Sequence, residues 1–323
     1  MSTASVGPGQ ETQLTVTPLA RGVWGVLATP FTGAACDVCE ASLVRAVEHY
    51  RKVGAAGLTV LGVFGEAARL SLAEQRSVVE IVAGARVDLP IVVGLPGLAT
   101  RVAVEQGQAA VRAAGAGLAG LMVQVNTADP AALGAHLRTV AAETGVGIVV
   151  QDYPLVSGVR IDQADLARCV ADNADIVVAV KSESPPTAPA IATLTAGLDV
   201  PVFGGLGGVG LLDELACGAS GAMTGFSYPE ALVATVRAFE QGGFEAARAV
   251  FSPWLPLVNF EAQPRVSLAV RKECLRARGF FTDARVRPPA PGFPEALRPL
   301  VAAHLAAANA LLGEGSARSP RPR

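Results

Sequence analysis

Eight short apolar runs alternate with longer stretches of helical periodicity, and this alternation constrains the fold more than any other feature of the chain. Strands that alternate with helices build parallel sheets, and eight such units over roughly 200 residues match the size of a (β/α)8 barrel. The predicted strands cover residues 22–28, 57–61, 90–94, 117–123, 147–150, 176–180, 200–204 and 221–224. The predicted helices cover residues 41–52, 72–85, 102–114, 131–144, 163–171, 189–196 and 209–217. The sequence therefore predicts an α/β fold, a (β/α)8 TIM barrel.

A dinucleotide-binding sheet of the Rossmann type is a poorer fit to this pattern. It uses fewer strands and needs Gly-x-Gly-x-x-Gly after the first strand, where this chain has Thr29-Pro30-Phe31. A glycine-rich segment at residues 204–208 does follow the seventh predicted strand. Barrels often shape such a loop around a substrate anion, so Gly205 is a candidate contact and a phosphate-binding barrel of another family stays open.

The chain divides into four predicted parts. Residues 1–20 lack the basic region and apolar core of a signal peptide and predict a flexible N-terminal tail. Residues 21–230 form the barrel, and helical periodicity continues over residues 231–312 as a C-terminal extension. Residues 313–323 have no periodicity and predict a disordered tail.

Composition excludes several classes of function. With 51% hydrophobic residues, 17% charged residues and a formal net charge of -2, the chain is typical of a soluble globular protein. The basic residues are scattered and aromatic residues make up only 5%, so we expect no nucleic-acid partner. Gly, Pro or a charge interrupts each apolar run before it could span a bilayer. We expect a cytoplasmic protein with no membrane partner.

Cysteines and histidines predict no metal site. The five cysteines are odd in number and form no even disulfide framework, as is typical of a reducing compartment. Cys36 and Cys39 make a Cys-x-x-Cys pair, but no second pair follows at zinc spacing. His49, His136 and His304 stand alone in helix-like segments.

A single lysine ends the sixth predicted strand. The apolar run Val-Val-Ala-Val at residues 177–180 reaches Lys181 and continues into Ser-Glu-Ser-Pro-Pro. Dry walls on the strand side disfavour an ammonium, so a partly neutral amine could attack a ketone carbonyl and form a Schiff base. From these residues alone, Lys181 could equally cap a buried strand with its charge in water.

Barrel enzymes place their chemistry at the carboxyl ends of strands, and the residues there form a recognisable set. The set consists of Thr29-Pro30-Phe31, Gly-x-x-Gly-Glu at 62–66, Gln-Asp-Tyr-Pro at 151–154, Lys181 and Thr224-Gly225. It resembles the dihydrodipicolinate synthase and N-acetylneuraminate lyase superfamily of class I aldolases, from about residue 22 to the C-terminal helices. The resemblance implies a lyase that acts on a small 2-oxo acid, with a covalent lysine imine in place of any cofactor. It also implies a homo-oligomer, either dimer or tetramer.

The resemblance implies that Lys181 carries the Schiff base and that Gly65-Glu66 shapes the turn beneath the substrate. Two hydroxyl residues usually precede that Gly-Glu pair, hold the substrate carboxylate and relay protons. In this chain their places are taken by Val63 and Phe64. Half of the usual carboxylate site is therefore missing.

The family's proton shuttle is also replaced. The place of its tyrosine is Gln151, and Tyr153 lies two residues further on. A neutral amide cannot take a proton at pH 7, so Tyr153, Glu183 or a bound water would have to act as the base. An arginine that the synthases carry two residues past the strand-five proline is Val156 here, which disfavours lysine biosynthesis.

Two further segments, Lys-x-Glu-x-Pro at 181–185 and Trp-Leu-Pro-Leu-Val-Asn at 254–259, look more like the sugar-acid dehydratase branch of the family. We therefore expect dehydration of a 2-keto-3-deoxy sugar acid, such as 2-keto-3-deoxyarabonate, or pyruvate-dependent aldol cleavage or condensation. Two alternatives stay open. One is 4-hydroxy-tetrahydrodipicolinate synthase proper, and the other is a catalytically altered barrel with a binding or regulatory role.

Several candidate residues also have a simpler structural interpretation. Glu66 could be an acid at a helix N-terminus, stabilised by the helix dipole. Tyr153 could pack against the barrel rim. Thr224 and Ser157 are small polar residues that could bind substrate or only satisfy backbone groups.

Overall fold

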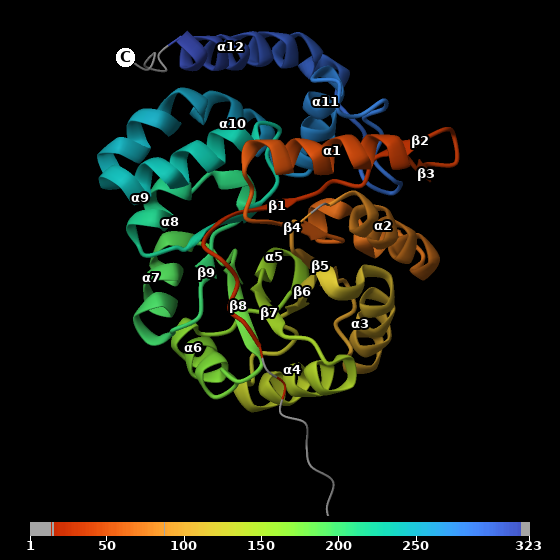
Figure 1. The fold of residues 1–323 in the computed structure, drawn as a ribbon, viewed down its shortest axis with the longest axis vertical. Helices are drawn as coiled ribbons and strands as arrows, with labels where there is room; N and C mark the ends of the chain where they lie inside the picture. Colours follow the sequence, from red (N-terminus) through yellow and green to blue (C-terminus); the bar gives the residue numbers. More distant parts are fainter. Residues whose placement is uncertain (1–13, 15, 87, 318–323) are drawn as a thin grey trace, which may run out of the picture.

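The computed structural model describes residues 14, 16–86 and 88–317. Its strands are β1 Gly22–Val26, β2 Phe31–Thr32, β3 Asp37–Val38, β4 Gly57–Val60, β5 Ile91–Leu95, β6 Leu118–Gln124, β7 Ile148–Asp152, β8 Val177–Ser182, β9 Val202–Phe203 and β10 Gly221–Thr224. Eight of them form one sheet in the order β10-β1-β4-β5-β6-β7-β8-β9, with every pair parallel. A further parallel bridge between Gly204 and Ala222 joins the two ends of the sheet. The sheet is therefore a closed barrel, ringed by helices, as predicted (Figure 1).

The ring of helices consists of α1 Glu40–Val53, α2 Leu72–Ala85, α3 Thr100–Ala114, α4 Pro130–Thr144, α6 Gln163–Ala171, α7 Thr187–Gly197 and α8 Leu211–Ala216. Each predicted strand and helix overlaps one of these elements. The prediction missed the short hairpin β2–β3 and the four-residue helix α5 Pro154–Ser157, which directly follows β7. Both lie at the carboxyl ends of strands, where loops vary without disturbing the barrel.

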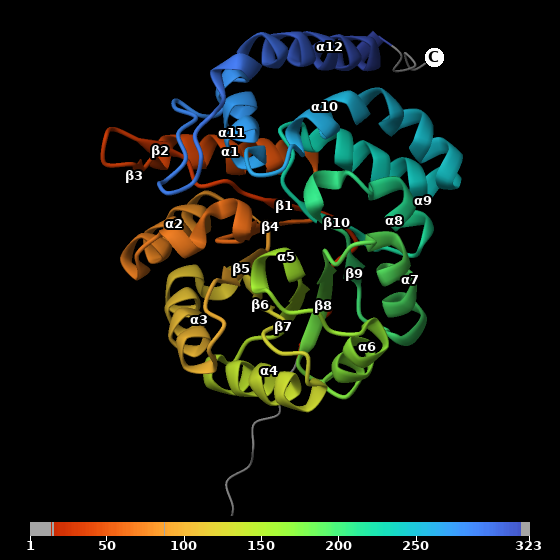
Figure 2. The same cartoon turned by 180° about the vertical axis from the view of Figure 1, so that it is seen from behind.

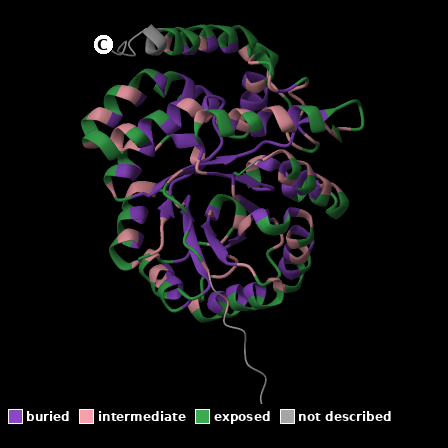
Figure 3. Ribbon diagram, in the orientation of Figure 1, coloured by how far each residue is buried: buried purple, intermediate pink, exposed green. Residues whose placement is uncertain are grey.

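The strands are apolar because both faces of the sheet are buried. One hydrophobic cluster fills the barrel interior and includes Trp24, Val92, Met122 and Phe203. A second, larger cluster lies between the strands and the helices. Figure 3 shows buried residues along the strands and on the inner sides of the surrounding helices. Neither strand face needs polar residues, so the strands appear as continuous apolar runs in the sequence.

The C-terminal extension consists of α9 Pro229–Phe251, α10 Leu255–Glu261, α11 Ser267–Ala277 and α12 Arg298–Ala317. Helix α9 packs against α1, α8 and β1. The segment after α11 returns to the barrel, where Arg45 Nε donates to the Phe280 carbonyl at 3.1 Å. From behind, α11 and this segment lie beside α1 and the β2–β3 hairpin (Figure 2). The extension is thus in contact with the carboxyl ends of the first strands.

Two predicted boundaries differ from the structure. Leu19, which the prediction placed in a flexible tail, is 6% exposed, and its backbone N–H donates to the Val178 carbonyl at 3.0 Å. Helix α12 continues to Ala317, although residues from 313 onward were predicted to be disordered. Residues 1–13 and 318–323 of the two predicted tails lie outside the described residues.

One helical segment among the described residues, Glu295–Gly313, is long and apolar enough to cross a membrane by length and composition alone. A single helix of this kind is weak evidence for a span. Its Val301, Leu305 and Ala308 belong to the main hydrophobic cluster, and α12 packs against α10 and α11. This packing gives the helix a partner within the fold.

Candidate active site

Lys181 reaches the barrel interior because of an irregularity in β8. Side chains of a strand alternate between its two faces, and Val177 packs outward in the helix-facing cluster. The register between β7 and β8 shifts by one residue at this point, so that Val178 and Ala179 both belong to the interior cluster. Val180 then points outward and Lys181 inward. Without the extra residue, strict alternation from Val177 would place Lys181 on the helix-facing side.

Lys181 and Glu183 form a buried ion pair. Their side chains are 5% and 6% exposed, and Lys181 Nζ lies 3.2 Å from Glu183 Oε2. Gln151, the neighbour of Lys181 across the β7–β8 pair, donates from Nε2 to the same carboxylate oxygen at 2.7 Å. The Leu206 backbone N–H donates to the other oxygen, Oε1, at 3.2 Å. The carboxylate is therefore held in place directly beside the amine.

A cavity of about 570 Å³ opens over Lys181. Its volume suits a small organic molecule. The lining combines the barrel mouth with the C-terminal extension and includes Val63, Phe64, Arg69, Tyr153, Leu155, Lys181, Glu183, Leu206, Gly207, Thr224, Arg265 and Arg271. Both the amine and the carboxylate of the ion pair can thus meet a ligand.

Tyr153 and Thr224 also line this cavity. Burial raises the pKa of Tyr153, and the nearby Glu183 carboxylate raises it further, so its hydroxyl stays protonated at neutral pH. Thr224 Oγ1 accepts a hydrogen bond from the Gly207 backbone N–H at 2.7 Å. Thr224 therefore holds the glycine loop as well as facing the cavity.

Four other predicted site residues do not line the cavity, namely Thr29, Gly65, Ser157 and Gly205. Thr29 Oγ1 donates to the Gly65 carbonyl at 2.6 Å and so supports the turn after β4. Ser157 Oγ donates to the Tyr153 carbonyl at 3.3 Å inside the short turn of α5. Gly205 lies directly behind Glu183, because a Cβ built on it would be 2.4 Å from Oε1. These residues position the site without lining the cavity.

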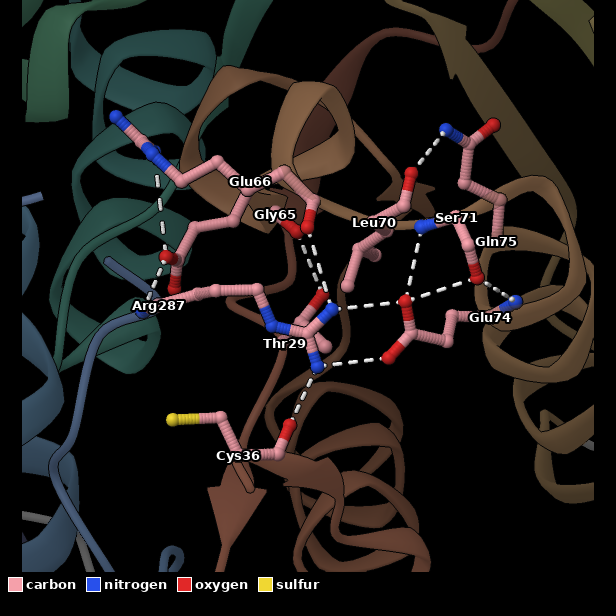
Figure 4. A network of polar contacts seen from close by, with 10 residues as sticks. Thr29, Cys36, Gly65, Glu66, Leu70, Ser71, Glu74, Gln75 and Arg287 are labelled. Atoms are coloured by element: carbon pink, nitrogen blue, oxygen red, sulfur yellow. Dashed lines mark hydrogen bonds and ion pairs between the residues drawn. The ribbon is translucent and has the colours of Figure 1, made fainter. Parts of the chain in front are cut away.

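Glu66 points away from the cavity and into a polar network. Its side chain is fully buried, Lys272 Nζ donates to its Oε1, and the Arg287 backbone N–H donates to its Oε2 at 2.9 Å. The Arg287 guanidinium in turn donates to Glu74 Oε2 at 2.8 Å and to the Cys36 carbonyl. Figure 4 shows the Glu66 carboxylate beside the Arg287 backbone, while the Arg287 guanidinium extends toward Glu74 and the Cys36 carbonyl. The carboxylate thus ties the turn after β4 to the C-terminal extension through Lys272 and Arg287, partners that the helix-dipole interpretation did not include.

The turn after β4 presents apolar side chains to the cavity. Val63 and Phe64 both belong to the lining, and the short 3-10 helix Val63–Gly65 carries no side-chain hydroxyl. The turn can offer a ligand only its backbone groups and a ring.

Sequence reasoning missed Arg271 and Arg69 as lining residues. Arg271 lies on α11, and no local pattern shows that this helix returns to the barrel mouth. Glu183 was considered only as one possible base, although its place two residues after Lys181 predicts the same strand face. Among the described residues, no group of three or more His, Cys, Asp or Glu side chains is placed to hold a metal ion.

Comparison with known proteins agrees with this geometry. Residues 19–308 match the family described as "Dihydrodipicolinate synthetase family". The chain belongs to this family. Its members are class I lyases and aldolases, so the predicted fold, family and enzyme class are confirmed. The family match covers the barrel together with most of the C-terminal extension.

Individual relatives differ in their activities. The chain is 29% identical to an L-2-keto-3-deoxyarabonate dehydratase of Azospirillum brasilense, over 85% of this chain and 90% of the relative. It is 31% identical to a 4-hydroxy-tetrahydrodipicolinate synthase of Kineococcus radiotolerans, over 87% and 91%. A crystal structure of dihydrodipicolinate synthase from Rhodopseudomonas palustris superposes with a TM-score of 0.83 at 30% identity, covering 91% of this chain and 99% of that one. These similarities establish the family but do not distinguish between the two reactions.

Proposed function

We propose that the protein dehydrates a 2-keto-3-deoxy sugar acid, such as 2-keto-3-deoxyarabonate, through an imine on Lys181. The observation that carries this proposal is the buried Glu183 carboxylate at 3.2 Å from the Lys181 amine. Dehydration needs a nucleophilic amine and one acid–base group that can reach the carbon next to the imine. The Lys181–Glu183 pair supplies both in one cavity.

The reaction then proceeds in balanced steps. The Lys181 amine adds to the keto carbon, and loss of water gives the protonated imine. Glu183 removes a proton from the adjacent carbon, and the electron pair moves toward the imine nitrogen. The protonated Glu183 then returns that proton to the departing hydroxyl of the next carbon, so that water leaves. Hydrolysis finally frees Lys181.

Gln151 acts in this scheme by holding Glu183. Its amide donates to Glu183 Oε2 at 2.7 Å, the same oxygen that lies near the amine. An amide cannot itself accept the proton at pH 7. The replacement of a tyrosine by Gln151 therefore moves the proton transfer to the neighbouring carboxylate.

The test is product analysis with 2-keto-3-deoxyarabonate as substrate. We expect a product that has lost one water, with no pyruvate and no aldehyde fragment. Tyr153→Phe tests the other residue that could act as the base, because it keeps the ring in the cavity and removes only the hydroxyl. Release of pyruvate as the main product would replace dehydration by aldol cleavage, and no turnover of any sugar acid would contradict the proposal.

A second candidate is condensation of pyruvate with aspartate semialdehyde. The 31% identical synthase relative supports it. Against it stands Val156, an exposed and uncharged side chain at the place where the synthases carry an arginine. A coupled assay with pyruvate and aspartate semialdehyde tests this candidate directly. No activity in either assay, together with retained binding of oxo acids, would favour a barrel with a binding or regulatory role.

The same proposal includes cofactor use, oligomeric state and cellular location. We expect the lysine imine to suffice without a cofactor, because the chemistry requires only an amine and an acid–base group. We also expect a homo-oligomer in the cytoplasm. Activity after dialysis against a chelator checks the expectation that no cofactor is needed. Light scattering of the purified protein checks the homo-oligomer.

A further inference from the structure

Arg271 is a buried cation whose hydrogen-bond donors lack acceptors. The residue is 9% exposed, it lies on α11, and it lines the cavity that contains Lys181 and Glu183. A guanidinium carries five N–H donors. Arg271 makes no hydrogen bond to any of the described residues, and its Nε is among the buried polar atoms without a partner. A buried donor without a partner costs free energy. The two terminal nitrogens of Arg271 are not among those buried atoms, so they are accessible to a ligand.

The nearest acid does not satisfy these donors. Glu261 Oε2 lies 3.6 Å from Arg271 Nε, which is close enough for charge attraction but too far for a hydrogen bond. Both oxygens of Glu261 already accept from Ser227, one from its hydroxyl and the other from its backbone N–H at 3.2 Å. Glu261 therefore balances the charge from behind, while the guanidinium remains available to a ligand.

The glycine loop leaves room for the guanidinium. Gly207 has φ +74°, and a Cβ built on it would be 1.9 Å from an Arg271 terminal nitrogen. Any other residue would be strained in its backbone and would also displace the guanidinium. The loop that follows β9 thus accommodates Arg271 beside Thr224 and Lys181 at the cavity wall.

Phe64 links Arg271 to the missing half of the carboxylate site. The Arg271 guanidinium carbon lies 5.3 Å from the centre of the Phe64 ring. Phe64 stands where the family's second hydroxyl residue is expected, and it leaves the turn without a side-chain donor. The Arg271 guanidinium therefore lies beside a turn that has no side-chain donor of its own.

We propose that Arg271 binds the carboxylate of the 2-oxo acid and replaces the hydroxyl pair of the turn after β4. The inference rests on the proposed imine chemistry and names the residue that determines specificity for an acid over a neutral ketone. Planar guanidinium and carboxylate groups pair through two parallel hydrogen bonds. Two other arginines line the cavity, but Arg69 and Arg265 are exposed to solvent, and Arg69 also lies 3.9 Å from Glu66.

The experiment compares pyruvate with pyruvamide, its uncharged analogue, by borohydride trapping on the full chain. The concentration that gives half-maximal adduct is measured for the unchanged protein and for Arg271→Gln. Loss of a charge-assisted pair predicts a rise of about 30–100-fold for pyruvate. For pyruvamide we expect no significant change. Arg101→Gln is the matched control, since it removes an exposed arginine that does not line the cavity, and we expect both ligands to be unaffected.

Arg271→Lys is a second variant for the case that Arg271→Gln misfolds, because it keeps a positive charge beside Glu261. It should raise the half-maximal pyruvate concentration about 10-fold through loss of the two-pronged contact, again without an effect on pyruvamide. Equal changes for the two ligands, or no change for pyruvate, would overturn the role of Arg271.

A second readout separates this inference from the proposed function. Lys181→Ala cannot form an imine, yet its carboxylate site should still bind pyruvate and raise the melting temperature. Adding Arg271→Gln should abolish that rise. If the unchanged protein forms no adduct but this thermal shift depends on Arg271, the imine proposal fails and the carboxylate site stands. If the thermal shift persists in the double variant, the carboxylate site is elsewhere.

Discussion

Two acids at the barrel mouth, Glu183 and Glu66, have opposite roles. Both are buried, and each pairs with a lysine. Glu183 faces the cavity, where its partner Lys181 is also a lining residue. Glu66 faces the C-terminal extension, where Lys272 and the Arg287 backbone hold both of its oxygens. We therefore propose that the pair reached by a cavity, Lys181 and Glu183, is the reactive one, while Lys272 and Glu66 are structural.

This difference explains how the turn after β4 can present apolar side chains to the cavity and still keep its fold. The polar contacts of the turn are made behind it, by Glu66 and by the Thr29–Gly65 hydrogen bond. Val63 and Phe64 face the cavity and carry none of those contacts. The side chains toward the ligand can change while the network behind them keeps the turn in place.

The largest expected effect is on catalysis. Glu183→Gln keeps the shape of the side chain but removes the acid–base group, and general acid–base catalysis contributes about 10²–10⁴-fold. We expect the dehydration rate to fall by that factor while imine formation at Lys181 persists. Single-turnover kinetics with borohydride trapping separate the two steps. A variant that dehydrates at the unchanged rate would place the base elsewhere, with Tyr153→Phe as the next variant to examine.

Breaking the structural pair, Glu66 and Lys272, should lower stability and leave imine formation intact. Lys272→Met removes the partner of a fully buried carboxylate, which costs about 3–5 kcal/mol of unfolding free energy. We expect a large loss in urea denaturation. The folded fraction should still form the Lys181 imine, because Lys272 does not line the cavity. Unchanged stability would contradict the structural role assigned to Glu66.

A third acid, Glu214, gives a pH dependence of stability. It lies behind the glycine loop, and burial raises its pKa to about 7, although a hydrogen bond from Thr187 opposes the shift. An acid with a raised pKa is most stabilising while protonated, so stability should fall as pH rises from about 4.5 to 7, by up to about 3 kcal/mol. Glu214→Gln should remove this slope in denaturation curves recorded at several pH values. A slope that survives the substitution belongs to another group.

The smallest effect is expected at the solvent edge of the Glu66 network. A hydrogen bond from Arg287 lowers the pKa of Glu74 to about 2. A lowered acid stabilises the fold above its unfolded pKa, and that stability is lost as pH falls from about 4.5 to 2. The carboxylate is about one-third exposed, so we expect no more than about 1 kcal/mol. Glu74→Gln should reduce the stability lost at low pH by this amount. An unchanged midpoint of acid unfolding would show that solvent screens the Glu74–Arg287 contact.

The barrel could be predicted from the sequence because both faces of its strands are buried, which leaves eight separate apolar runs. Lys181 could be predicted as a chemical candidate for the same reason, since it is the charge that ends such a run. Its inward orientation could not be derived, because it depends on the register shift at Ile148 and Val149.

The roles of Arg271, Lys272 and Arg287 also could not be predicted. These residues reach the barrel mouth only because the C-terminal extension folds back over it. No periodicity in their own segment encodes that contact. Glu66 was considered as an acid at a helix N-terminus, but the partners that bind it lie more than 200 positions away in the chain.

We propose that Lys181 forms the imine, and intact-mass spectrometry after borohydride reduction with pyruvate or a 2-keto-3-deoxy sugar acid measures this without further assumptions. The chain contains three lysines, Lys52, Lys181 and Lys272, so peptide mapping assigns an adduct without ambiguity. We expect a single adduct on Lys181, which Lys181→Ala abolishes and which the exposed control Lys52→Ala leaves intact. The absence of an adduct, or one on another lysine, would contradict it.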